Sequence, residues 1–283
     1  MLNKIFRKSE KQLLKYLSTL LTTEYQYTDI TTTPAYIYAE GNIPVMLVAH
    51  LDTVHKNLPK EIFHDTFKNV FWSPQGIGAD DRAGVWAILQ LITPKVKPYI
   101  LFTTQEEVGG IGASIAAKEI QAPDIKFIIE LDRKGSNDAV FYDCCNQEFI
   151  DYIISFGFKE NRGSFSDISV LCPEWNIAGV NLSTGYYNAH TKEEYLNLNE
   201  LNINIKKIKK IFSSIPAETF TFESDSQYVV DDYYGDETFI CDNCCQEIYK
   251  MNESHIQNLC YDCYRYLTIK EVNNLDEFKL RTE

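Results

Sequence analysis

Residues 43–49 read Ile-Pro-Val-Met-Leu-Val-Ala and are followed at once by His50, Leu51 and Asp52. A short, continuous apolar run of this kind is typical of a strand buried on both faces, as in parallel sheets. In extended backbone, residues i and i+2 point to the same side, so His50 and Asp52 are expected to face one common space. This stretch therefore predicts a buried strand that ends in a polar site.

The same pattern recurs along the first 216 residues, with apolar runs alternating with helix-forming segments. Strands are expected at residues 99–104, 126–131, 139–142 and 179–183, and helices at 83–92, 111–120, 149–155 and 201–212. This alternation predicts an α/β fold with a mixed, mostly parallel central sheet flanked by helices. In residues 1–21, lysine and arginine are interspersed among apolar positions, which predicts an amphipathic helix. The same charges interrupt any signal-peptide core there.

Charge divides the chain into parts. The 283 residues carry 40 acidic and 27 basic side chains, a net charge of −13, which disfavours a nucleic acid partner. Residues 217–240 contain seven acids and no base. We therefore expect a main domain at residues 1–216, an acidic linker at 217–240 and a cysteine-containing module at 241–283.

Membrane and export signals are not expected. No apolar run approaches the roughly 20 residues needed to cross a bilayer. These features predict a cytoplasmic protein with no membrane partner, in which the eight cysteines are reduced or metal-bound.

Polar clusters follow the expected strands in chain order. Beyond His50 they supply two further acidic pairs, one more aspartate and a second histidine: Asp80-Asp81, Glu106-Glu107, Asp132 and His190. Taken alone, an aspartate pair before a helix usually caps it, and a glutamate pair after a strand is usually solvated. Together they form a nitrogen and oxygen ligand set that suits zinc or a similar divalent ion. The number of carboxylates favours two ions, a known hydrolytic arrangement.

The adjacent glutamates are expected to differ in role. Both cannot point at a metal from one regular strand. If Glu107 is a ligand, Glu106 is free to act as a general base.

Over about residues 43–198 these motifs resemble the two-zinc, co-catalytic metallopeptidase clan. Its members include bacterial secreted aminopeptidases, tripeptidase T, tetrahedral aminopeptidases and glutamate-releasing carboxypeptidases. The resemblance implies their three-layer fold, with helices on both faces of the sheet. It also implies that His50 binds one zinc, that Asp52 orients His50, and that Asp80 bridges both zincs. Glu107 would bind one zinc, Asp132 and His190 the other, and Glu106 would be the general base.

In this clan the peptide bond after the bridging aspartate is often cis, which the resemblance carries over to Asp80–Asp81. Two spacings favour the compact, single-domain aminopeptidase-like branch. His50 to Asp80 spans 30 residues and Asp132 to His190 spans 58, which leaves no room for the large insertions of other branches. The motif Asp-Asp-Arg-Ala-Gly at residues 80–84, in contrast, is more similar to the sequences of those other branches.

The implied activity is hydrolysis of a peptide or amide bond by an exopeptidase, with zinc-activated water and Glu106 taking the proton. A deacylase acting on N-acyl amides would use the same ligands. A non-catalytic scaffold that presents the acidic tail is the alternative outside enzymes. Asp167 could hold a substrate amine or cap a helix, and Tyr186 and Tyr187 could line the pocket or pack.

The C-terminal cysteines form a separate motif. Cys241-x2-Cys244 and Cys260-x2-Cys263 are separated by fifteen residues, a spacing typical of a four-thiolate structural zinc site. The segment resembles a zinc ribbon or treble-clef finger. Lys250 and Arg265 are the only bases between Phe239 and Leu267, so a protein partner is favoured over nucleic acid.

Overall fold

The computed structural model describes residues 1–224, 238–240 and 247–249. The chain divides into two compact units, Met1–Ser224 and Asp225–Glu283. In the second unit the described residues form one antiparallel pair, β13 (Thr238–Ile240) with β14 (Glu247–Tyr249). The cysteines expected to hold a structural zinc lie outside the described residues, and that site stays a prediction.

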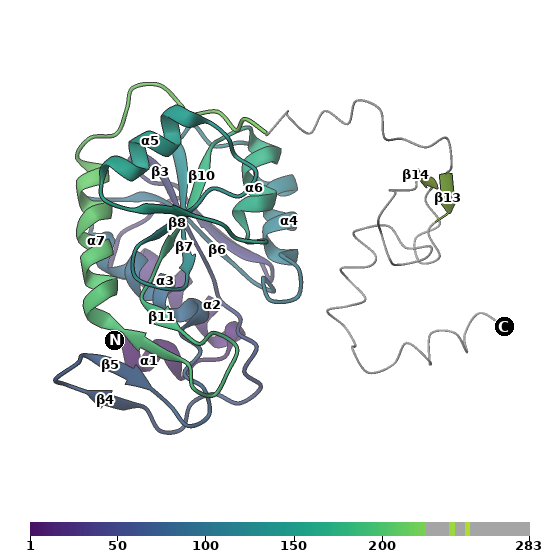
Figure 1. Cartoon of the computed structure of the whole chain (residues 1–283). Helices are drawn as coiled ribbons and strands as arrows, with labels where there is room; N and C mark the ends of the chain where they lie inside the picture. The colour runs from purple at the N-terminus through teal and green to yellow at the C-terminus, as the bar shows by residue number, and fades with distance from the viewer. Residues whose placement is uncertain (225–237, 241–246, 250–283) are drawn as a thin grey trace. The chain divides into compact units, whose positions relative to one another are not determined.

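A central sheet of eight strands organises the first unit, in the order β1-β2-β6-β3-β7-β10-β8-β9 (Figure 1). Its four middle strands, β6, β3, β7 and β10, are parallel to one another. The pairs β1–β2, β2–β6 and β10–β8 are antiparallel, and the edge strand β9 is parallel to β8. The mixed, mostly parallel sheet expected from the sequence is confirmed. The strands are β1 (Ile30–Thr32), β2 (Tyr36–Ala39), β3 (Ile43–His50), β6 (Pro98–Thr103), β7 (Phe127–Arg133), β8 (Asp138–Val140), β9 (Lys159–Asn161) and β10 (Gly179–Ser183).

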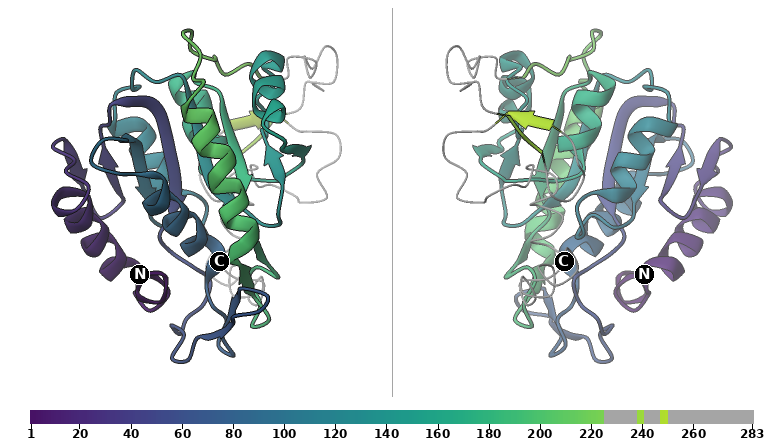
Figure 2. Two further views of the ribbon diagram at one scale, coloured as in Figure 1. Left: turned by 90° about the vertical axis from the view of Figure 1, so that its left-hand side faces the viewer. Right: turned by 90° about the vertical axis from the view of Figure 1, so that its right-hand side faces the viewer.

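Helices cover both faces of this sheet, because its middle strands are apolar on both sides. In β3, Val45 and Leu47 enter one apolar cluster, whereas Met46 and Val48 enter another. The first cluster includes α3 (Ala79–Leu91), α5 (Gln147–Ser155) and α7 (Leu198–Phe212), and the second includes α4 (Ile111–Glu119) and α6 (Ile168–Trp175). Figures 1 and 2 show α3 and α7 on one side and α4 and α6 on the other. The fold has the three layers that were expected.

A second, smaller sheet was not anticipated. Its order is β11-β12-β5-β4, all antiparallel, from β4 (Phe63–Asp65), β5 (Val70–Trp72), β11 (Tyr186–Tyr187) and β12 (Tyr195–Asn197). Phe71 and Leu196 are cross-strand partners on its buried face, and Trp72 and Tyr195 are partners on the more exposed face. Its strands β4 and β5 lie in the interval between His50 and α3, and His190 lies in the loop from β11 to β12.

The N-terminal segment forms two helices, α1 (Leu2–Phe6) and α2 (Glu10–Thr23), where the sequence predicted one. The break comes at Ser9, whose hydroxyl accepts from the backbone N–H of Gln12 while the Gln12 side chain accepts from Ser9 N–H. This reciprocal pair is a capping box, which starts a new helix. Within the described residues, no helix is long and apolar enough to cross a membrane.

The first unit continues eight residues beyond Pro216, where the acidic linker was expected to begin. The backbone N–H of Phe220 donates to Lys126 O, and Phe220 O accepts from Ala178 N–H. The Phe220 ring lies 5.2 Å from that of Phe149 and 6.2 Å from that of Phe127, between centroids. Packing of one aromatic residue thus fastens residues 217–224 to the sheet despite their acidic composition.

We expect Phe220→Ala to lower the free energy of unfolding by about 2 kcal/mol, because it empties a partly buried aromatic site. Phe67→Ala is the matched control, since Phe67 is 94% exposed and should change stability by less than about 0.5 kcal/mol. Chemical denaturation of the full chain measures both. Equal effects of the two variants would mean that residues 217–224 are not part of the folded unit.

Candidate metal centre

The polar clusters meet at the carboxyl edge of the parallel strands. His50 is the last residue of β3, Asp132 lies near the end of β7, and Glu107 follows β6. Asp80 lies at the start of α3, which packs on β3 and β7. Parallel neighbouring strands end at the same edge, which is where open α/β sheets place their functional groups.

Asp80 lies between the two histidines. Its Oδ1 is 3.1 Å from His50 Nε2, and its Oδ2 is 3.2 Å from His190 Nε2. The peptide bond that joins Asp80 to Asp81 is cis, as the resemblance implied. One carboxylate therefore faces two separate histidines with its two oxygens.

Asp132 and Glu107 each lie beside one of the two histidines, so the centre has two halves that share Asp80. Asp132 Oδ1 is 3.4 Å from His50 Nε2, and Glu107 Oε2 is 3.1 Å from His190 Nε2. The sequence expectation grouped Asp132 with His190, and that grouping differs from the structure. The reason is strand order, because β7 pairs directly with β3 and so brings Asp132 beside His50.

Asp52 connects one histidine to both glutamates. Its Oδ1 is 3.1 Å from His50 Nδ1 and accepts from Glu106 N–H, and its Oδ2 accepts from Glu107 N–H at 3.1 Å. The carboxylate thereby fixes the orientation of the His50 ring. It also fixes the turn that separates Glu106 from Glu107.

Asp81 has a different role from its neighbour. It is fully buried, its Oδ2 accepts from His50 N–H, and its Oδ1 accepts from Gly84 N–H. A Cβ at position 84 would lie 1.8 Å from Leu131 O, so only glycine lets α3 approach β7 this closely. Asp81 and Gly84 together set the position of α3 beside the two strands that carry His50 and Asp132.

Positive charge is scarce in this buried cluster. Burial raises the pKa of Glu106 to about 10, and burial with the charge of Asp80 raises the pKa of Asp132 to about 7. Hydrogen bonds to Asp80 and Glu107 raise the pKa of His190 to about 10. Each shift adds or retains a proton among crowded carboxylates, which reduces the repulsion between them.

The donor set fits divalent metal ions. Two overlapping groups, His50 with Asp81 and Asp132, and His50 with Asp80 and Glu107, each place their ligand atoms within 4.8 Å of one another. Glu107 Oε1 is buried and has no hydrogen-bond partner among the described residues. A buried, unsatisfied carboxylate oxygen is costly, and coordination to a metal ion would satisfy it.

The three residues proposed to contact substrate make hydrogen bonds to protein groups. Asp167 is fully buried at the N-cap of α6, and the Thr103 hydroxyl donates to its Oδ2. The Tyr186 hydroxyl donates to Asp132 O at 2.8 Å, and the Tyr187 hydroxyl donates to Glu200. In the structure these side chains hold neighbouring protein groups.

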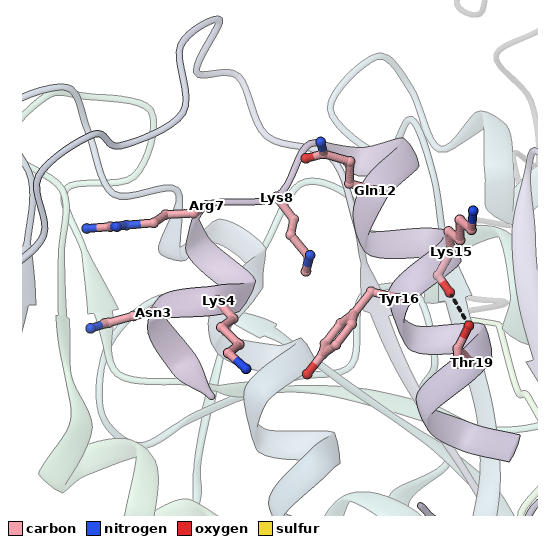
Figure 3. Close-up of a pocket in the computed structure, with 8 residues that line it drawn as sticks. All are labelled: Asn3, Lys4, Arg7, Lys8, Gln12, Lys15, Tyr16 and Thr19. Atoms are coloured by element: carbon pink, nitrogen blue, oxygen red, sulfur yellow. Dashed lines mark hydrogen bonds between the residues drawn. The ribbon is translucent and has the colours of Figure 1, made fainter. Parts of the chain in front are cut away.

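The first unit has a cavity beside His190 and another at the N-terminal helices. One of about 630 Å³ lies beside the centre and is lined by His190, Lys192, Lys56 and His55 among others. The other, of about 730 Å³, lies between α1 and α2, with Lys4, Lys8 and Tyr16 facing it in Figure 3. The cavity beside His190 has the position that a substrate of the centre would need.

Sequence reasoning missed the buried residues that support the centre. Arg82 is 1% exposed and donates to Asp52 O at 3.1 Å and to Lys8 O at 3.0 Å, which joins the α1–α2 connection to the centre. Glu194 is fully buried and accepts from the backbone of Gly78 and Asp80. The backbone groups that these two side chains bind leave no signal in the residue pattern.

The sequence and the fold were both compared with known proteins. Residues 73–142 match the M42 glutamyl aminopeptidase family. Among solved structures, aminopeptidase PepT of Bacillus cereus superposes with a TM-score of 0.58 at 13% identity, over 75% of this chain and 96% of that one. The TET1 peptidase of Pyrococcus horikoshii gives 0.56 at 13%, over 74% and 98%. A Zn-dependent exopeptidase of Parabacteroides distasonis gives 0.54 at 16%, over 74% and 94%.

The chain shares the fold of these peptidases. No curated protein matches it. The M42 match includes residues 80–84, Asp-Asp-Arg-Ala-Gly. This motif is more similar to the other branches of the clan than to the compact branch that the two spacings favoured. Between His50 and α3 this exopeptidase-like fold carries only the β4–β5 hairpin.

Replacing the buried guanidinium tests the support of the centre. Arg82→Met should lower the free energy of unfolding by about 3 kcal/mol, because it removes two hydrogen bonds and leaves nearby carboxylates without a counter-charge. Arg7→Met is the control, since Arg7 is exposed. Denaturation with excess chelator excludes any contribution from metal binding. Equal stabilities of the two variants would show that Arg82 is not part of the support.

Proposed function

We propose that this chain is a zinc-dependent exopeptidase of the aminopeptidase type. The observation that carries the proposal is that the two oxygens of Asp80 face His50 and His190, while Asp132 lies beside His50 and Glu107 beside His190. This arrangement supplies a shared ligand and two terminal ligands for each of two ions. The fold shared with exopeptidases and the M42 match support the same activity.

The ligands divide between two positions. His50 and Asp132 would hold one zinc, Glu107 and His190 the other, and Asp80 would be shared. When bound, two zinc ions supply Lewis acidity to the scissile carbonyl and to water. We also propose a structural zinc, held by Cys241, Cys244, Cys260 and Cys263. Residues 241–283 would then form a separate module that binds a protein partner.

Glu106 is the proposed general base. Its backbone N–H is fixed by Asp52, and its side chain is placed near Asp132 and Asp167, whose charges act on its pKa. Positive charge in the centre would lower that pKa and leave Glu106 ionised. The carboxylate would take a proton from the attacking water and deliver it to the leaving amine.

The cavity beside His190 would receive the substrate peptide. Lys56 and Lys192 line it and give it positive charge. Neither residue belongs to the ligand set, so they would affect substrate affinity and leave metal binding unchanged.

Glu106→Gln should leave a folded, zinc-loaded protein whose kcat falls by about 10²–10⁴-fold, because it removes the proton acceptor. Glu160→Gln, an exposed substitution of the same type on β9, should retain full activity. A panel of aminoacyl, peptidyl and N-acyl amides would be assayed with both variants and the parent protein. Hydrolysis of N-acyl amides alone would assign a deacylase, and no hydrolysis of any amide by a zinc-loaded parent would contradict the proposal.

A further inference from the structure

Glu194 is a buried carboxylate with no role in the proposed chemistry. It lies four residues after His190, just before β12, and is fully buried. Its Oε2 accepts from Gly78 N–H at 2.8 Å, and its Oε1 accepts from Asp80 N–H at 2.9 Å. The side chain thus holds the backbone of the segment that delivers Asp80 to the centre.

His55 holds Glu194 in turn. Its Nε2 is 2.7 Å from Glu194 Oε2, and its side chain is 11% exposed. The ring packs against Gly76, where an added Cβ would lie 2.2 Å from it. Three segments therefore meet at Glu194: the loop after β3, the turn before α3, and the loop that carries His190.

The chemistry of the partners calls for a carboxylate at position 194. Backbone N–H groups only donate, and His55 Nε2 also donates when it carries the ring proton, so Glu194 supplies all the accepting oxygens. Hydrogen bonds to an ionised acceptor are shorter and stronger than neutral ones. A glutamine would offer one oxygen and turn its NH₂ group towards a donor.

The backbone at Asp80 needs such a restraint. Asp80 has φ −81° and ψ 103°, and Asp81 has φ −118° and ψ 43°; both lie outside the helical range, although both belong to the first turn of α3. No intrahelical hydrogen bond satisfies the N–H groups at a helix start, so an external acceptor determines where this turn lies. A displaced turn would move both oxygens of Asp80 away from His50 and His190.

We propose that Glu194, braced by His55, is a positioning residue that fixes Asp80 between the two halves of the centre and thereby sets the affinity for zinc. The inference rests on the proposed function, in which Asp80 is the shared ligand. Glu194 itself contacts neither substrate nor metal in this account. Its effect passes through the backbone of Gly78 and Asp80.

The test compares Glu194→Gln with Glu193→Gln in the full chain. Glu193 is the adjacent residue and is exposed, so the control makes the same chemical change one position away. Zinc affinity is measured by competition with a chromophoric chelator, and folding of the metal-free proteins by circular dichroism and thermal unfolding. Glu194→Gln should bind zinc at the centre about 10–100-fold more weakly, the usual effect of losing a group that orients a ligand. Glu193→Gln should stay within about twofold of the parent.

A purely structural role for Glu194 would lower the melting temperature of the metal-free protein and leave zinc affinity unchanged. A folded Glu194→Gln with the zinc affinity of the parent would overturn the proposal. If Glu194→Gln does not fold, His55→Ala is the variant that tests the proposal. It removes the contact between His55 and Glu194 and keeps the two hydrogen bonds from the backbone of Gly78 and Asp80. It should weaken zinc binding in the same direction by a smaller factor, and unchanged affinity would overturn the proposal. A parent protein that binds no zinc at the centre would contradict the proposed function instead.

Discussion

Mutual repulsion among buried carboxylates is the constraint on which the rest of this structure depends. Asp80, Asp132 and Glu107 converge on two histidines at one edge of the sheet. Burying several carboxylates together is costly unless their negative charge is compensated by hydrogen-bond donors or positive charge. Here the compensation comes from the histidines, from the Ser166 and Tyr186 hydroxyls that donate to Asp132 and, in our proposal, from two divalent ions. Each of these carboxylates has an oxygen within 3.4 Å of a histidine nitrogen.

The supporting contacts come from every element around the centre. Asp52 orients His50 and fixes the glutamate turn, and Asp81 ties α3 to β3. Arg82 connects the N-terminal helices to Asp52. Asp81 and Arg82 are buried and Asp52 is partly buried, and the partners of all three are mostly backbone atoms. The centre is therefore built into the packing of the first unit, so its geometry and the stability of that unit depend on the same contacts.

The positions of His50 and Asp132 at one edge of the sheet could be predicted because each lies at the end of a strand that leaves a clear sequence pattern. His50 ends a continuous apolar run, and Asp132 ends another. The division of ligands into halves could not be predicted, since it depends on β3 lying between β6 and β7. The second sheet was missed because strands of two or three residues give too few alternating positions to recognise. Glu194 was missed because Gly78 and Asp80 bind it through their backbone, whatever their side chains.

The central claim is that Asp80 is shared by two metal ions. Crystals of the full chain grown with zinc would be measured on both sides of the zinc absorption edge, and the anomalous difference map would locate each ion. Our account predicts two peaks flanking Asp80, about 3.5–4 Å apart, one beside His50 and Asp132 and one beside Glu107 and His190. A map with a single peak at this edge of the sheet, or with none, would contradict it.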